Sequence, residues 1–250
     1  LNFALMQKYV VGIRKNNHRL ISLVENLLFA MSVGFDIFAW LQIYNFDRTK
    51  PYFTMQALLK KAFFFDRDGI VNQRIIDGYV LTTDDFAFIP DIFPLFRMVK
   101  EAGFLAILVT NQQGIGKGQM TEGDLSVIHA TMQERLRSET GYEFDDIYFA
   151  GERDMSSRSG CCGDIMAQSR RKPSPAMLLE AHERWGINFA QSWMIGDSLS
   201  DADAGKAVGA RTILVGNFRT DDADIIVPSL RALLSQTSPF LAAPLLSPML

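Results

Sequence analysis

The chain has 250 residues, a formal net charge of −3, a pI of about 5.7 and 21% charged residues. This length is enough to bury a sizeable core, and the acidic balance argues against binding of nucleic acid through a broad basic surface. The only two cysteines, Cys161 and Cys162, are adjacent. No disulfide framework can therefore form, which favours a reducing, cytoplasmic compartment.

Residues 1–54 differ from the rest of the chain in their pattern of apolar and polar residues. Several basic residues precede an apolar stretch, 20–44, which resembles a membrane span in length but is interrupted by Glu25 and Asp36. Charges near a bilayer centre are costly, which weighs against a membrane location. Three readings stay open for this extension: a mis-assigned start upstream of the true start at Met55, a soluble helical appendage, or a membrane anchor.

Short apolar runs alternate with helix-like stretches from about residue 61 to residue 227. Strands are predicted at 62–66, 104–110, 146–150, 192–197 and 211–215, and helices at 91–102, 121–140, 174–185 and 200–208. Ser174 stands as a capping residue before Pro175, which suits the first position of a helix. The alternation predicts an α/β fold, with a parallel sheet covered by helices on both faces. Residues 228–250 are expected to form a C-terminal helix and a loosely held tail.

Two carboxylates follow the first predicted strand, and they are the most informative feature of the chain. Asp66 and Asp68 come directly after three phenylalanines and are followed by Gly69. Side chains two apart in an extended segment point the same way, so both carboxylates face one small volume. Such a pair repels unless a cation lies between them. Mg²⁺ suits ligands that are all oxygen, and it also recruits phosphate oxygens.

Three further polar segments follow at the ends of later elements. Thr110 and Asn111 end a strand and lead into a glycine-rich loop, which could cradle an anion or serve as an ordinary strand–helix junction. Lys172 precedes a proline and a helix, where it could face a phosphate or lie in a solvated basic loop. Asp197 ends another strand, with Asp201 four residues later, either as a functional carboxylate or as a helix cap.

In this order, the four segments resemble the motifs of the haloacid dehalogenase-like (HAD) phosphohydrolase superfamily. FFFDRDGIVN, VTNQQGIGKG, RRKPSPAML and MIGDSLSDADAG are most similar to the branch of histidinol-phosphatases and D-glycero-D-manno-heptose 1,7-bisphosphate phosphatases. The resemblance implies a Rossmann-like sheet in residues 55–227 with a minimal cap or none. It also implies dependence on Mg²⁺ and a small phosphorylated substrate.

The resemblance assigns a role to each matching residue. Asp66 corresponds to the nucleophile that forms an aspartyl-phosphate, and Asp68 to the general acid and base. Asp66, the backbone carbonyl of Asp68, and Asp197 would hold Mg²⁺. Thr110 and Lys172 would bind the oxygens of the reacting phosphoryl group.

Two more residues of these motifs are expected to contact substrate, and two positions depart from the family pattern. Asn111 is placed with the phosphate-binding residues, and Arg171 would contact a more distant group such as a second phosphate. The usual zinc-loop cysteines before the lysine are replaced by Gln168 and Arg170, so no zinc is expected. The usual basic residue after the fourth-motif aspartate is Ser198.

The leading hypothesis is a monomeric, Mg²⁺-dependent phosphatase that acts on heptose 1,7-bisphosphate. The second hypothesis is a phosphatase that hydrolyses histidinol phosphate. The third is a polynucleotide 3′-phosphatase, which the acidic net charge does not support. A non-catalytic binding protein on the same fold would be expected to lack one of the carboxylates or the lysine. All of them are present in this chain.

Overall fold

The structure is a computed structural model that describes residues 59–152, 169–218, 221 and 223–236, all within the unit Leu59–Leu250. The readings of residues 1–54, the expected absence of zinc in the Cys161–Cys162 segment and most of the C-terminal tail concern residues outside this set. None of the described helices is both long enough and apolar enough to cross a bilayer.

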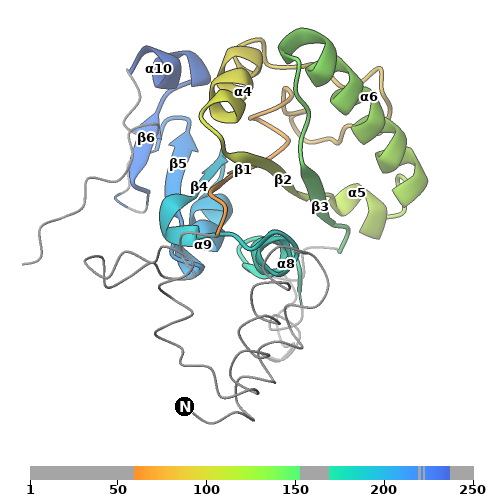
Figure 1. The fold of residues 1–250 in the computed structure, drawn as a ribbon. Helices are drawn as coiled ribbons and strands as arrows, with labels where there is room; N and C mark the ends of the chain where they lie inside the picture. The colour runs from red at the N-terminus through yellow and green to blue at the C-terminus, as the bar shows by residue number, and fades with distance from the viewer. Residues whose placement is uncertain (1–58, 153–168, 219–220, 222, 237–250) are drawn as a thin grey trace, which may run out of the picture. The chain divides into compact units, whose positions relative to one another are not determined.

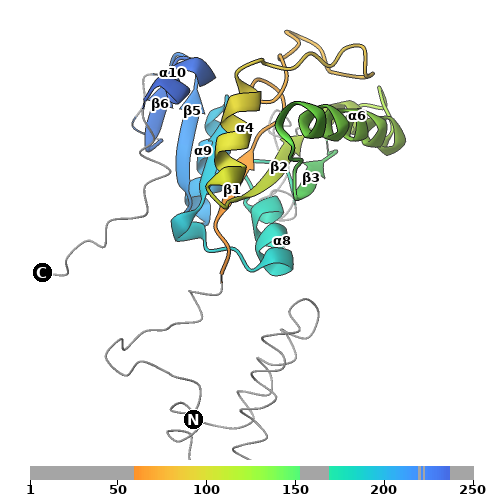
Figure 2. The same cartoon turned by 45° about the horizontal axis from the view of Figure 1, so that its top comes forward.

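A six-stranded parallel sheet forms the centre of the fold, with the strand order β3-β2-β1-β4-β5-β6 (Figure 1, Figure 2). The strands are β1 (Ala62–Phe65), β2 (Leu105–Asn111), β3 (Asp146–Ala150), β4 (Trp193–Gly196), β5 (Arg211–Val215) and β6 (Ile225–Val227). The chain builds outward from β1 through β2 and β3, then returns to the other side of β1 with β4. This reversal beside β1 is the switch point at which open α/β sheets bind ligands.

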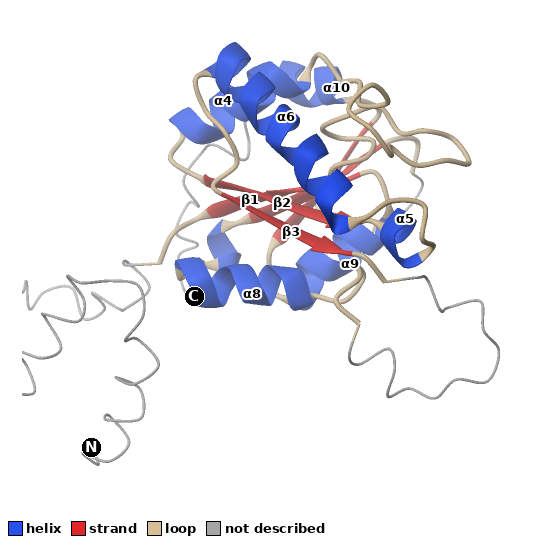
Figure 3. Cartoon of the chain, turned by 90° about the vertical axis from the view of Figure 1, so that its right-hand side faces the viewer, coloured by secondary structure: helices blue, strands red, loops and turns tan. Residues whose placement is uncertain are grey.

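Helices cover both faces of the sheet, as the sequence predicts (Figure 3). They are α4 (Ile92–Glu101), α5 (Gln113–Gly116), α6 (Glu122–Thr140), α8 (Ala176–Trp185), α9 (Leu199–Ala207) and α10 (Leu230–Ser235), with a 3₁₀ turn, η2 (Phe189–Gln191). Helices α4, α6 and α10 lie on one face, and α8 and α9 lie on the other.

The phenylalanines of β1 show why this strand is apolar along its whole length. Phe63 and Phe65 belong to the core cluster beneath α4 and α6, whereas Phe64 belongs to the cluster beneath α8. All three side chains are fully buried. Successive side chains of a strand point to opposite faces, so a strand covered on both faces must be apolar at every position. This packing fixes the place where the strand ends and Asp66 begins.

Some local predictions differ from the structure. Helix α8 begins at Ala176 rather than at residue 174, and Pro175 stands before its first residue. Ser174 Oγ accepts a long hydrogen bond of 3.4 Å from the backbone N–H of Ala176, but it does not cap the helix. Strand β6 and the single turn α5 were not predicted, because three or four residues are too few to show a periodic pattern.

Candidate active site

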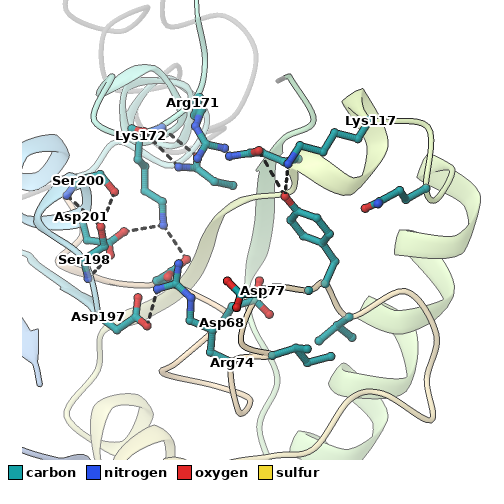
Figure 4. Close-up of a pocket in the computed structure, with 18 residues that line it drawn as sticks. Asp68, Arg74, Asp77, Lys117, Arg171, Lys172, Asp197, Ser198, Ser200 and Asp201 are labelled. Atoms are coloured by element: carbon teal, nitrogen blue, oxygen red, sulfur yellow. Dashed lines mark hydrogen bonds and ion pairs between the residues drawn. The ribbon is translucent and has the colours of Figure 1, made fainter. Parts of the chain in front are cut away.

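All of the predicted site residues except Thr110 line one pocket at the carboxyl ends of β1, β2 and β4 (Figure 4). Asp66 and Asp68 follow β1, and Asp197 follows β4, which pairs directly with β1. Lys172 is brought in from the segment that precedes α8. Together with Asn111, these residues line a pocket of about 590 Å³, a volume typical of a site for a small molecule.

Lys172 is the centre of a buried ion cluster. Its ammonium group contacts Asp66 Oδ1 at 2.7 Å and Asp201 Oδ1 at 2.6 Å, and it donates to the carbonyl of Val109 at 2.7 Å. Only 2% of the Lys172 side chain is exposed. Burial favours the neutral amine, but the two carboxylates outweigh it and raise the pKa of Lys172. The lysine is therefore a permanent cation whose three donors all have partners within the protein.

Three carboxylates converge beside this lysine. One oxygen each from Asp66, Asp197 and Asp201 lies within 4.8 Å of the other two. Burial raises the pKa of Asp66 to about 7, although Lys172 offsets part of this effect. Burial also raises the pKa of Asp197 and of Asp201. Burial is the largest cause of the raised pKa in each of the three groups, and repulsion from a neighbouring carboxylate adds to it.

Two glycines allow these carboxylates to approach the backbone so closely. A Cβ at Gly69 would collide with the carboxylate of Asp197, and one at Gly196 would collide with that of Asp201. Gly69 also has a φ of +95°, a backbone conformation that residues with a side chain rarely adopt. The glycine after the two aspartates is therefore required by the site as well as by the turn.

Asp201 has two structural partners that sequence reasoning did not combine. Its Oδ2 accepts the backbone N–H of Ser198 at 3.1 Å in the capping box of α9, while its Oδ1 pairs with Lys172. Asp201 is thus the capping carboxylate of α9 and, at the same time, an ion-pair partner of Lys172. The spacing of four residues after Asp197 was the available signal.

Asp68 lies in a different environment from Asp66. Arg67 donates to both of its oxygens at 3.0 Å, and the side-chain amides of Asn72 and Gln112 donate at 2.9 and 3.0 Å. Burial opposes ionisation of Asp68, but Arg67 and the two amides outweigh it and hold the pKa below its usual range. The two carboxylates after β1 therefore differ in protonation behaviour although they are only two residues apart.

The structure places the predicted phosphate-binding residues in different ways. Thr110 is fully buried, and its hydroxyl accepts a hydrogen bond of 2.8 Å from Gln112. The side-chain amide of Asn111 makes two hydrogen bonds to the backbone of Lys172. Asn111 accepts from the N–H of Lys172 at 2.9 Å and donates to the carbonyl of Lys172 at 3.1 Å. Asn111 therefore positions the lysine, and Arg171 lines the same pocket.

Sequence reasoning assigned no role to Arg74, Tyr79 and Lys117, three polar residues of the pocket wall. Arg74 donates to Asp197 Oδ2 at 3.0 Å, and Lys117 donates to the hydroxyl of Tyr79 at 2.6 Å. Arg74 and Tyr79 come from the irregular segment between β1 and α4, and Lys117 follows α5. Loop residues of this kind leave no periodic signal, because the path of the backbone decides where they point.

Comparison with known proteins agrees with this arrangement. A family model described as HAD-hydrolase-like matches residues 169–233. A D-glycero-β-D-manno-heptose-1,7-bisphosphate 7-phosphatase of Rhodopseudomonas palustris is 32% identical over 174 residues, covering 70% of this chain and 91% of the relative. A D-glycero-α-D-manno-heptose-1,7-bisphosphate 7-phosphatase of Burkholderia mallei is 36% identical over 156 residues, covering 62% of this chain and 79% of the relative.

A solved structure supports the same grouping. The crystal structure of D,D-heptose 1,7-bisphosphate phosphatase from B. bronchiseptica, complexed with magnesium and phosphate, aligns with a TM-score of 0.58. It is 26% identical and covers 70% of this chain and 97% of that one. The fold and the site thus define a phosphatase of the HAD superfamily. Within that superfamily, the chain belongs to the heptose-bisphosphate phosphatase family.

Proposed function

We propose that this phosphatase removes the 7-phosphate of D-glycero-D-manno-heptose 1,7-bisphosphate in a Mg²⁺-dependent reaction through an aspartyl-phosphate. The observation that carries the proposal is the buried cluster in which Lys172 holds Asp66 beside Asp197. This cluster supplies a fixed nucleophile, a cation and a metal site in one place. The relatives named above act on this sugar, in its β or its α form.

Asp66 is the proposed nucleophile. Lys172 fixes one of its oxygens at 2.7 Å, while the residue also lines the pocket. Attack on phosphorus requires the ionised carboxylate, and a group whose pKa is about 7 is ionised in only about half of the molecules at neutral pH. Any further cation in the cluster lowers this pKa and increases the reactive fraction.

Asp68 is the proposed general acid and base. Its three hydrogen-bond donors favour the ionised form, which suits the second half of the reaction, when a water must lose a proton before it attacks the aspartyl-phosphate. The first half requires Asp68 to donate a proton to the leaving oxygen. A dianionic phosphate bound beside Asp68 raises its pKa by repulsion and so promotes protonation when substrate is present.

The donor set fits Mg²⁺. Three carboxylates with raised pKa values lie together, and hard oxygen ligands are those that Mg²⁺ prefers. Both oxygens of Asp201 already have partners in Lys172 and Ser198, so Asp66, Asp197 and the backbone carbonyl of Asp68 would hold the ion. When bound, Mg²⁺ would offset negative charge on the phosphoryl group. Lys172 and Thr110 are proposed to bind the same group.

The experiment is a comparison of kcat/KM over a panel of phosphorylated metabolites. The panel contains the α and β forms of heptose 1,7-bisphosphate, the matching 7-phosphate and histidinol phosphate. We expect the bisphosphate to be preferred over the monophosphate by about 1.5–3 kcal/mol if Arg171 makes one charge-assisted hydrogen bond to the second phosphate. Arg171→Ala should lower that preference and spare much of the activity on the monophosphate. A higher kcat/KM for histidinol phosphate would contradict the substrate and leave the phosphatase chemistry intact.

A further inference from the structure

Lys117 is a cation in the pocket wall that the reaction described above does not use. It follows the single turn α5 and is exposed. A lysine at the end of a helix commonly turns back toward the last carbonyl groups. Here the ammonium group instead donates to the hydroxyl of Tyr79 at 2.6 Å and lies 5.1 Å from the centre of its ring.

Tyr79 holds the lysine in this orientation. The tyrosine hydroxyl accepts from Lys117 and donates to Gln113 Oε1 at a longer 3.4 Å. Within the described part of the chain, the ammonium group of Lys117 forms no ion pair and donates to no group besides the hydroxyl of Tyr79. An ammonium group has three N–H donors, so two donors of this pocket-lining lysine have no partner among the described residues.

Lys117 lies apart from the reacting carboxylates. In Figure 4 it lies on the side of the pocket opposite Asp197 and Ser198, and Arg171 lies between the two sides. The cation of the reacting end, Lys172, is proposed to serve the reacting phosphoryl group, so it is not available to a second anionic group. The 590 Å³ pocket includes both sides, so a ligand that touches both must extend well beyond a single phosphate group.

We propose that Lys117, oriented by Tyr79, is a specificity-determining residue that binds the anionic group at the end of the substrate remote from the reacting phosphate. This proposal rests on the proposed function, in which that group is the 1-phosphate of the bisphosphate. A compact ammonium charge with two donors suits a phosphate oxygen. Tyr79 is a positioning residue: it reduces the rotamer freedom that the lysine would otherwise lose when the ligand binds.

The test compares the bisphosphate with the 7-phosphate in Lys117→Met, which keeps an unbranched apolar side chain and removes the charge. We expect the ratio of kcat/KM values for the two substrates to fall about tenfold, the lower end for a charge-assisted hydrogen bond because the site is exposed. Activity on the monophosphate should stay within about twofold. Lys117→Arg should retain most of the preference, and Tyr79→Phe should lose about threefold. Lys206→Met, an exposed lysine outside the pocket, serves as the matched control.

A binding measurement separates this proposal from the proposed function. Calorimetry with Asp66→Asn, which cannot turn substrate over, gives the affinity for each sugar phosphate with and without Lys117→Met. A selective loss of affinity for the bisphosphate supports the role of Lys117 even if the wild-type enzyme prefers another substrate for turnover. Equal losses for the two ligands, or no loss for either, overturn it. Equal affinity of the Asp66→Asn protein, with Lys117 intact, for the bisphosphate and the 7-phosphate also overturns it.

Discussion

Replacing Lys172 by methionine tests whether the buried ion cluster organises this site. The change removes an ammonium group that contacts two carboxylates and a carbonyl at 2.6–2.7 Å, and leaves Asp66 and Asp201 facing each other without a cation. Breaking a buried ion pair from one side costs about 3–5 kcal/mol of unfolding free energy. Turnover should be lost as well, because the pKa of Asp66 rises above about 7 and the nucleophile becomes protonated.

The sign of the pH dependence follows from this shift. Above pH 7 the folded variant keeps a proton on Asp66 that the folded wild type loses. Unfolded aspartates are ionised at this pH, so the extra proton makes the variant less stable as pH rises. One proton contributes about 1.4 kcal/mol per pH unit. The destabilisation of Lys172→Met should therefore be about 2 kcal/mol larger at pH 8.5 than at pH 7.0.

Urea denaturation at both pH values measures this directly. EDTA is included so that no metal ion compensates for the lost charge, and Lys206→Met is the control for removal of an exposed lysine. Adding Asp201→Asn to Lys172→Met should restore part of the stability, because it removes one of the two unpaired carboxylates. A Lys172→Met protein with the wild-type unfolding midpoint at both pH values would refute the electrostatic reasoning. So would a destabilisation that is the same at both.

Three other predictions concern the nucleophile, the metal and the start of the chain. Asp66→Asn should abolish turnover while retaining the fold, as judged by thermal unfolding, whereas Asp68→Asn should slow turnover and still allow some phosphorylation; near-wild-type hydrolysis by Asp66→Asn would exclude the mechanism. EDTA should stop activity and Mg²⁺ should restore it, and elemental analysis should find no stoichiometric zinc; one zinc per chain would show that the segment before Lys172 binds metal. A protein starting at Met55 should retain full activity, because all the proposed catalytic groups follow it; aggregation or loss of activity would assign residues 1–54 a structural role.

The sequence was most informative where chemistry and secondary structure coincide. Asp66 and Asp197 could be predicted because each ends an apolar strand, and the parallel α/β order places the ends of β1 and β4 together. The pairing of Lys172 with Asp201 depends on how α8 and α9 pack on the same face of the sheet. Local spacing carries no information on that contact.

The amide of Asn111 has contacts that its motif alone could not reveal. It was expected among the phosphate-binding residues, and the structure engages both of its side-chain atoms with the backbone of Lys172. Arg74 and Lys117 show the opposite case, since the sequence assigned a role to neither, although Lys117 lies within the quoted segment VTNQQGIGKG. Their positions depend on the path of two irregular segments, and such segments carry recognition residues on a rigid scaffold.

The charges at the reacting end explain why metal and substrate should bind together. Among the described residues, Asp66, Asp197 and Asp201 form ion pairs with two cations, Lys172 and the exposed Arg74. With all three carboxylates ionised, one negative charge is in excess before a phosphate, itself close to a dianion at neutral pH, enters the pocket. A divalent cation makes the net charge of the cluster positive, so it removes the repulsion between the carboxylates and the phosphate. The phosphate in turn offsets the positive charge that the cation brings. By linkage, Mg²⁺ must then raise the affinity for the phosphorylated substrate by the same factor by which the substrate raises the affinity for Mg²⁺.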